Sequence, residues 1–578
     1  MKKERQIHLL TADGERLERE GRAQLYPRPH LERDSFFSLD GIWELEIRDR
    51  RGHVTSKQIR VPFVPQSRLS GIQSEVPQGA TLTYKRQFSL PQGFCKGGRV
   101  LLHIGAADRF CGVYLNGASL GGNDGGYGEL CLDVTAHLKE ENKIEVWVLD
   151  NGCTDYPYGK QRKKRGGMWY TPVCGIWQSV WMECVPERYV EEIEIKTQGD
   201  VASLFAKIAG DGSKTGSVTL HLEGGDTDFP LTDGCAEIAV PSPVYWSPEH
   251  PQLYRITLRV GEDTVRSYFA LRTLEIKKVG GFKRLCLNGK PYFFHGLLDQ
   301  GYFSGGIFTP AQPSGYEQDI LAAKRLGFNM LRKHIKVEPE RFYYDCDRLG
   351  MVVFQDMVNN GSYSFVRDTA LPTLGFKRRN DKRMHRDPYA RACFLQSMEQ
   401  TVRRLSFHPS VCYWTIFNEG WGQFDHAAAY DALRALDDTR FIDSVSGWFL
   451  PPRGEAKSDV ESPHVYFKEI RLQAGEKPLV LSEFGGYSYK VEGHCFNLDK
   501  AYGYRSFKAR EDFETALLAL YREQVLPHIG KGLCAAVYTQ LTDVEDEING
   551  LLTYDRRVVK VSEQSMQALA AELKSAIE

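Results

Sequence analysis

Helix-like and strand-like segments alternate over roughly the last 300 residues of the chain, from about residue 276 to the C-terminus. Apolar runs without polar alternation are typical of strands that are buried on both faces. The predicted helices cover residues 316–326, 338–349, 388–407, 426–436 and 513–529, and the predicted strands cover 328–332, 351–355, 411–417, 441–445, 463–466, 479–482 and 533–540. Such alternation predicts a closed barrel of parallel strands surrounded by helices.

An open, doubly wound sheet is the structural alternative to this barrel. That fold often carries a glycine-rich phosphate-binding turn directly after a strand. Neither a GxGxxG nor a P-loop motif follows any predicted strand. We therefore favour a C-terminal (β/α)8 TIM barrel over residues 276–578.

The first half of the chain has a different pattern of predicted elements. Residues 1–185 contain short alternating segments separated by glycine and proline, and Asn116-Gly117 is a hairpin signal between two of them. Residues 186–275 repeat this pattern on a smaller scale. The expected fold class is therefore multidomain β plus α/β, with an N-terminal jelly-roll β-sandwich, an immunoglobulin-like β-sandwich and the barrel.

Charge and cysteine content narrow the range of partners. The chain has 74 lysines and arginines against 75 acidic residues, so nothing favours nucleic acid or an acidic membrane surface. The one dense basic run, residues 162–165, lacks interleaved aromatic residues and is interpreted as a solvated loop. Thirteen cysteines without a CxxC pair favour a reducing compartment. No apolar run is long enough to span a membrane, so we expect a soluble, cytoplasmic protein.

Two predicted strands lead directly into a glutamate. Glu419 follows the apolar run 411–417, and Glu483 follows the run 479–482. Functional residues of a TIM barrel lie at the C-terminal ends of its strands, so both carboxylates should face one cavity. Two facing carboxylates are the machinery of glycosidic bond cleavage. We expect Glu419 to be the acid/base and Glu483 to be the nucleophile, although structural ion pairs at the barrel rim are the simpler alternative.

Further polar or aromatic residues are predicted to join these glutamates at the strand ends. They are Arg332, His334, Asp356, Asn418, Trp448, His464, Tyr466 and Gln540. The Asn418 amide can orient a sugar hydroxyl, and aromatic rings such as Trp448 can cover the C–H face of a pyranose. Taken alone, the pattern around His334 favours a core histidine. Asp356 could equally cap the loop that follows its strand.

No ligand spacing in the sequence demands a metal, and no cofactor motif is present. The acidic run of Asp543, Glu545, Asp546 and Glu547 does not have the spacing of an EF-hand loop. It is therefore interpreted as a solvated loop. The basic stretch 359–386 is expected to shape the mouth of the cavity.

At these positions the chain resembles glycoside hydrolase family 2 over nearly its full length. Segments 417–420 (FNEG) and 482–485 (SEFG) resemble the family's acid/base and nucleophile motifs. Segments 175–178 (GIWQ) and 245–254 (YWSPEHPQLY) resemble motifs of its two β-sandwich domains. The resemblance implies a retaining exo-acting β-glycosidase with a glycoside substrate, and it implies that Tyr466 assists the nucleophile. Members are often dimers or tetramers, so a homo-oligomer is compatible with it.

The chain also departs from the family pattern at two places. The histidine after the second barrel strand, His334, is shifted by one position, which puts its role in doubt. β-Glucuronidases carry an N-x-K pair near the chain end, whereas this chain has Glu547-Ile548-Asn549 and no lysine there. An acidic side chain would repel a uronate, so we expect a neutral sugar, with galactose first. A β-glucuronidase, β-mannosidase or β-galactofuranosidase is the alternative, and a catalytically inactive carbohydrate-binding protein is the alternative from another class.

Overall fold

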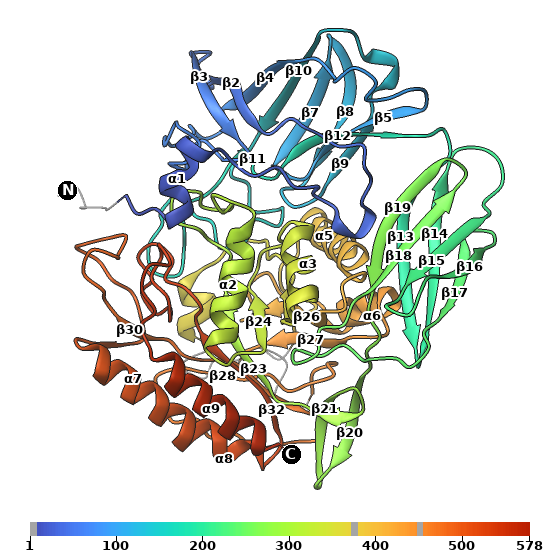
Figure 1. Ribbon diagram of the computed structural model, residues 1–578. Helices are drawn as coiled ribbons and strands as arrows, with labels where there is room; N and C mark the ends of the chain where they lie inside the picture. The colour runs from blue at the N-terminus through green and yellow to red at the C-terminus, as the bar shows by residue number, and fades with distance from the viewer. Residues whose placement is uncertain (1–7, 372–379, 448–454, 578) are drawn as a thin grey trace.

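The computed structural model describes residues 8–371, 380–447 and 455–577. Two β-sandwiches precede a barrel of eight parallel strands, which confirms the expected fold class. In Figure 1 the N-terminal sandwich lies above the barrel, and the second sandwich lies beside both.

The N-terminal sandwich consists of a four-stranded and a six-stranded antiparallel sheet. The first has the order β1 (Phe37–Ser38), β12 (Val180–Val185), β5 (Arg99–Ile104), β9 (Leu130–Asp133), and the second has the order β3 (Val54–Val61), β2 (Gly41–Arg48), β4 (Thr81–Phe88), β10 (Asn142–Leu149), β7 (Phe110–Leu115), β8 (Ala118–Asp124). The short strands β6 (Ala107–Asp108) and β11 (Gly175–Ile176) pair with each other. Asn116 and Gly117 have φ values of +53° and +89°, as the predicted tight hairpin between β7 and β8 requires.

The cysteines behave mainly as small buried side chains. Cys111, Cys286, Cys412 and Cys534 are all buried and free. Cys95 and Cys184 form a disulfide in the N-terminal sandwich, which the sequence pattern does not predict.

The second sandwich is smaller and packs two antiparallel sheets around one apolar core. Its sheets have the orders β13 (Tyr189–Gln198), β14 (Val201–Ala209), β17 (Cys235–Ala239) and β16 (Thr227–Leu231), β15 (Gly216–His221), β18 (Tyr254–Val260), β19 (Asp263–Phe269). Trp246 is fully buried, and its indole donates to Asp347 O of the barrel at 2.7 Å. This tryptophan therefore anchors the second sandwich on the barrel.

The barrel strands form one parallel sheet in chain order, apart from the point where the sheet closes. They are β23 (Phe294–Asp299), β24 (Met330–Lys333), β25 (Val352–Asp356), β26 (Val411–Asn418), β27 (Phe441–Ser446), β28 (His464–Val465), β29 (Leu479–Gly485) and β32 (Leu533–Thr539). Backbone hydrogen bonds from Asp459 to Ile442 and from Gly447 to Ser462 join the β27 side to the segment before β28. The sequence reading found seven of these strands and missed β23, which follows a hairpin strand without an intervening helix.

The predicted barrel helices are present with small shifts at their ends. They are α2 (Ser314–Arg325), α3 (Glu340–Leu349), α5 (Pro388–Leu405), α6 (His426–Leu436) and the continuous run α7 (Arg510–Ala519), η4 (Leu520–Val525), α8 (Leu526–Ile529). The remaining elements are α1 (Ala12–Glu20), η1 (Pro29–Leu31), η2 (Thr135–His137), η3 (Val366–Ala370), α9 (Glu563–Ser575), the sheet β20 (Leu274–Val279), β21 (Phe282–Leu287), β22 (Lys290–Pro291), and the pair β30 (Tyr487–Tyr489), β31 (Arg505–Phe507). Among the helices of the described residues, none combines the length and apolar composition needed to cross a bilayer.

Candidate active site

The two glutamates lie at the C-terminal ends of β26 and β29. Glu419 directly follows β26, and its side chain is 22% exposed. Its backbone has φ of +51°, a left-handed conformation that is rare for a residue with a Cβ and that often marks functional positions. Glu483 lies within β29 and is only 5% exposed. The more open carboxylate is therefore the one predicted to exchange protons.

Three donors surround the Glu483 carboxylate. Arg332 Nη1 donates to Oε1 at 3.1 Å, and the Tyr466 hydroxyl donates to Oε2 at 2.8 Å. His464 Nδ1 lies 3.5 Å from Oε2. Burial opposes ionisation of this carboxyl, but the positive charges of His464 and Arg332 outweigh it and lower the pKa of Glu483 to about 2. Glu483 is therefore ionised over the whole physiological pH range.

His464 lies between the two glutamates. Its Nδ1 is 2.9 Å from Glu419 Oε1, on the same side as its contact with Glu483. A carboxylate oxygen of Glu419 and one of Glu483 lie within 4.8 Å of each other. We call Glu419, His464, Glu483 and Arg332 the carboxylate cluster. One oxygen of each glutamate within 4.8 Å is compatible with the carboxyl separation of about 5 Å in retaining glycosidases, whereas inverting enzymes hold their carboxyl groups about 6.5–9.5 Å apart.

Arg332 connects most of the predicted site residues. It donates from Nε to Asp356 at 2.9 Å and from Nη2 to Asn418 Oδ1 at 2.8 Å. Because the Asn418 oxygen is engaged, the amide NH2 remains to donate to a ligand. His334 Nδ1 contacts Asp356 Oδ2 at 2.6 Å, and burial lowers the pKa of His334 to about 4. His334 is thus bonded to a carboxylate and not to a backbone carbonyl, and Asp356 bonds two side chains instead of capping a loop.

The other predicted residues differ in how they join the site. The Tyr466 ring stacks on Tyr504 with centroids 4.1 Å apart, and its hydroxyl also contacts Thr539. Gln540 is buried and bonds Asn549, so it contacts neither glutamate directly. Trp448, like residues 372–379 of the basic stretch, lies outside the described residues.

The interpretation of the acidic run 543–547 as a solvated loop is wrong. Asp543, Glu545, Asp546 and Glu547 are each at most 9% exposed. Each is engaged: Asp543 by Lys560, Glu545 by the Thr171 backbone N–H, Asp546 by Asn497, and Glu547 by Tyr170 and Asn549. The sequence suggests a solvent-exposed run because several of its partners lie far away in the chain, and two of them, Tyr170 and Thr171, belong to the N-terminal domain.

A loop of the N-terminal sandwich reaches over the end of the barrel. The backbone N–H groups of Tyr158 and Gly159 donate to Asn359 O, and a Cβ at Gly159 would lie 2.9 Å from Ile335 O just beyond β24. Lys160 follows this contact. Its charge adds to those of His464 and Arg332 in lowering the pKa of Glu483, and it opposes the rise that burial gives to the pKa of Glu547. Sequence reasoning missed Lys160, because it does not stand at the end of a recognisable barrel strand, and it singled out Glu547 only through the family resemblance.

Two facing carboxylates at the C-terminal end of a (β/α)8 barrel are the arrangement that the class of O-glycosidases uses. Comparison of the sequence with family models agrees with this class. Residues 276–525 match the glycosyl hydrolases family 2 TIM barrel domain, residues 54–172 match the glycosyl hydrolase 2 galactose-binding domain-like family, and residues 188–272 match glycosyl hydrolases family 2. The chain belongs to glycoside hydrolase family 2.

Similar proteins differ in the sugar that their names state. A β-galactosidase from Aeromonas hydrophila is 27% identical over 72% of this chain, which spans 42% of that relative's length. A β-glucuronidase from Felis catus is 23% identical over 80% of the chain and 79% of its own length. The structure of a β-galacturonidase from Eisenbergiella tayi superposes with a TM-score of 0.68 at 17% identity, covering 95% of this chain and 99% of that one. These likenesses establish family and fold but not the sugar.

Proposed function

We propose that this chain is a retaining exo-β-glycosidase that hydrolyses a non-reducing-end, β-linked neutral sugar by double displacement. Glu483 attacks the anomeric carbon and forms a glycosyl-enzyme ester, while Glu419 protonates the leaving oxygen. Glu419 then removes a proton from the water that hydrolyses the ester. The observation that carries this proposal is the approach of the two carboxylates to within 4.8 Å around His464.

The surroundings of each glutamate support its assigned role. Glu483 is held ionised by the charges of His464 and Arg332, as a nucleophile requires, and it accepts a hydrogen bond from Tyr466. Glu419 is the more exposed of the two, as is needed for a group that exchanges protons with a leaving group and then with water. An inactive sugar-binding protein would have no need for this pair.

A neutral sugar, with galactose first, is supported by Glu547. This buried carboxylate is close enough to Glu483 for their charges to interact, and burial together with that repulsion raises the pKa of Glu547. A uronate would bring a further negative charge to this place. Lys160 is the one observation that favours the alternative, a uronidase, because its cation acts on the same two carboxylates.

Kinetics on a panel of nitrophenyl β-glycosides, including pyranosides, furanosides and uronides, test the sugar. The highest kcat/KM on the galactoside supports the proposal, and the highest value on a uronide rejects the neutral sugar.

The acid/base role is tested separately with Glu419→Ala. This variant should retain activity on aryl glycosides with good leaving groups and be rescued by azide, because such substrates need proton donation least. Equal loss on good and poor leaving groups would contradict the acid/base role.

A further inference from the structure

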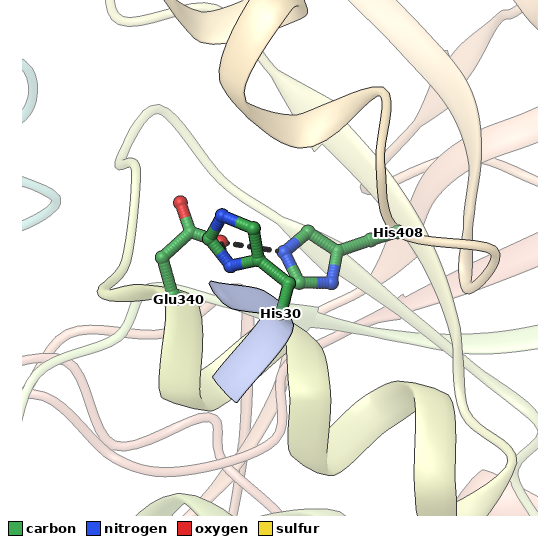
Figure 2. Close-up of side chains that lie close together, drawn as sticks. All are labelled: His30, Glu340 and His408. Carbon is green, nitrogen blue, oxygen red and sulfur yellow. Dashed lines mark hydrogen bonds and ion pairs between the residues drawn. The ribbon is translucent and has the colours of Figure 1, made fainter. Parts of the chain in front are cut away.

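A second group of histidine and glutamate side chains lies where the N-terminal segment meets the barrel. His30 comes from η1, Glu340 is the first residue of α3, and His408 lies in the turn before β26. Figure 2 shows the three side chains converging from these separate segments. One ligand-type atom from each lies within 4.8 Å of the other two. We call these three residues the junction cluster.

The hydrogen bonds at the edge of the junction cluster orient its donor atoms. His408 Nδ1 lies 2.7 Å from Asp347 Oδ2, and because a carboxylate only accepts, this nitrogen carries a proton. His408 Nε2 lies 2.7 Å from Glu340 Oε2, so by the same argument it also carries a proton, which must leave before this nitrogen can bind a metal. Arg404 donates to the other oxygen of Glu340. A carboxylate behind a ligating histidine is the usual outer support of zinc ligands, and Asp347 stands in that position.

An ion-pair network alone does not explain the position of the His30 side chain. Its Nδ1 is buried and has no hydrogen-bond partner among the described residues, yet it faces Glu340 Oε2 at 3.5 Å. Zinc bonds of about 2.0–2.1 Å in a tetrahedral arrangement place neighbouring ligand atoms about 3.4 Å apart. The His30–Glu340 distance already has this value. The His408–Glu340 distance would need to open by about 0.7 Å. The proton on His408 Nε2 would be released to solvent, so that two bonds to the metal replace the hydrogen bond.

Access and a fourth ligand are available beside the junction cluster. A cavity of about 460 Å³ between the three domains is lined by His30 and Glu340. Its other charged lining residues include Glu129, Glu183, Arg28, Arg33, Arg403 and Arg404. The cavity provides an entry path for a cation and room for a water ligand. Two imidazoles, one carboxylate and a water form a ligand set that Zn²⁺ accepts.

We propose that His30, Glu340 and His408 bind one Zn²⁺ ion, which ties the N-terminal segment to the barrel. This site is separate from the carboxylate cluster and does not depend on the proposed function. Its ligands come from three segments that side-chain contacts join across the junction, so bound zinc would act as a structural link.

The test measures zinc per chain by mass spectrometry in tag-free protein that is stripped with a chelator, supplied with ZnCl2 and freed of excess. Wild-type protein should hold one more zinc than His30→Ala, and His30→Cys, which restores a ligand atom, should hold as much as wild type. The exposed histidine in His53→Ala is the matched control and should not change the content. Zinc on Glu419, His464 and Glu483, whose atoms are also close together, would be present in every one of these proteins and cancels in the comparison.

Equal zinc content in wild type and His30→Ala overturns the proposal and leaves a hydrogen-bonded ion-pair network. Should His30→Ala not fold, the Glu483→Gln protein decides, because that change removes the other candidate ligand set. One zinc per chain in Glu483→Gln, with the ligand-field spectrum of four- or five-coordinate Co²⁺ after substitution, supports the site. No retained metal in Glu483→Gln rejects it.

Discussion

The carboxylate cluster and the junction cluster use the same residue types in different settings. In the carboxylate cluster, Glu419 and Glu483 face each other across His464, and Glu419 keeps 22% of its side chain exposed. In the junction cluster, the single Glu340 is 3% exposed, and both of its oxygens are engaged, one by Arg404 and one by His408. Two facing carboxylates can act as acid/base and nucleophile, whereas the single carboxylate of the junction cluster has no second carboxylate within that cluster to share such work.

The scaffold of the two clusters also differs. The residues of the carboxylate cluster come from β24, β26, β28 and β29, whose ends meet at one side of the barrel. Those of the junction cluster come from a short 3₁₀ turn, the start of a helix and a loop. A regular barrel holds reacting groups at fixed spacing. The irregular junction depends on its own side-chain contacts, so removing a charge there should affect stability more than chemistry.

The largest expected effect separates the two glutamates by activity. Glu483→Gln removes the nucleophile and should lower kcat/KM on an aryl glycoside by about 10⁴-fold or more, while Glu340→Gln should stay within about threefold of wild type. Steady-state kinetics measure both, and circular dichroism establishes that each variant is folded. Comparable losses in two folded variants would erase the distinction between the clusters.

Much of this fold could be predicted because its elements carry local signals. Helix 426–436 was predicted with the bounds that the structure has, and the apolar runs that became β26 and β29 were predicted to within one to three residues. The strand β23 was missed because β20, β21 and β22 precede it instead of a helix. Periodicity identifies elements one at a time, and it loses those that break the alternation.

The candidate site could be predicted only as far as it follows the barrel. Arg332, His464 and Tyr466 stand at or just beyond strand ends, and the structure brings them to Glu483. Lys160 and Glu547 could not be found this way, because their place depends on how one domain packs on another. The same limit explains why the acidic run was misread: a sequence shows the charges but not the distant partners that bury them.

The second effect compares two ion pairs formed by neighbouring residues of α5. Arg404 pairs with the buried Glu340, and Arg403 pairs with Glu399, whose side chain is 50% exposed. Glu340→Gln leaves a buried guanidinium uncompensated and should lower the free energy of unfolding by about 3–5 kcal/mol, whereas Glu399→Gln should change it by less than about 0.5 kcal/mol. Urea denaturation measures both. A small effect of Glu340→Gln would show that the junction is held by packing alone.

The third effect tests how much one donor contributes to the carboxylate cluster. Tyr466→Phe removes the hydroxyl that donates to Glu483 at 2.8 Å. A hydrogen bond to a charged group is worth about 1.5–3 kcal/mol, so kcat/KM should fall by about 10- to 100-fold. Tyr521→Phe is the matched control, because its buried hydroxyl has no partner among the described residues. Unchanged kinetics in Tyr466→Phe would leave Arg332 and His464 as the groups that hold the nucleophile.

The smallest effect probes the contribution of the N-terminal sandwich to the carboxylate cluster. The charge of Lys160 adds to those of His464 and Arg332, which overcome burial and lower the pKa of Glu483 to about 2, against an ordinary value of 4.5. Lys160→Met should therefore raise this pKa, and the acid limb of kcat/KM should move to higher pH with a loss of less than about tenfold at the acid end. Lys164→Met, which removes an exposed charge from the same loop, should leave the profile in place. If both variants give the wild-type pH profile, the loop covers the barrel without acting on its carboxylates. The carboxylate cluster would then depend on the barrel alone, whereas the junction cluster depends on contacts between domains.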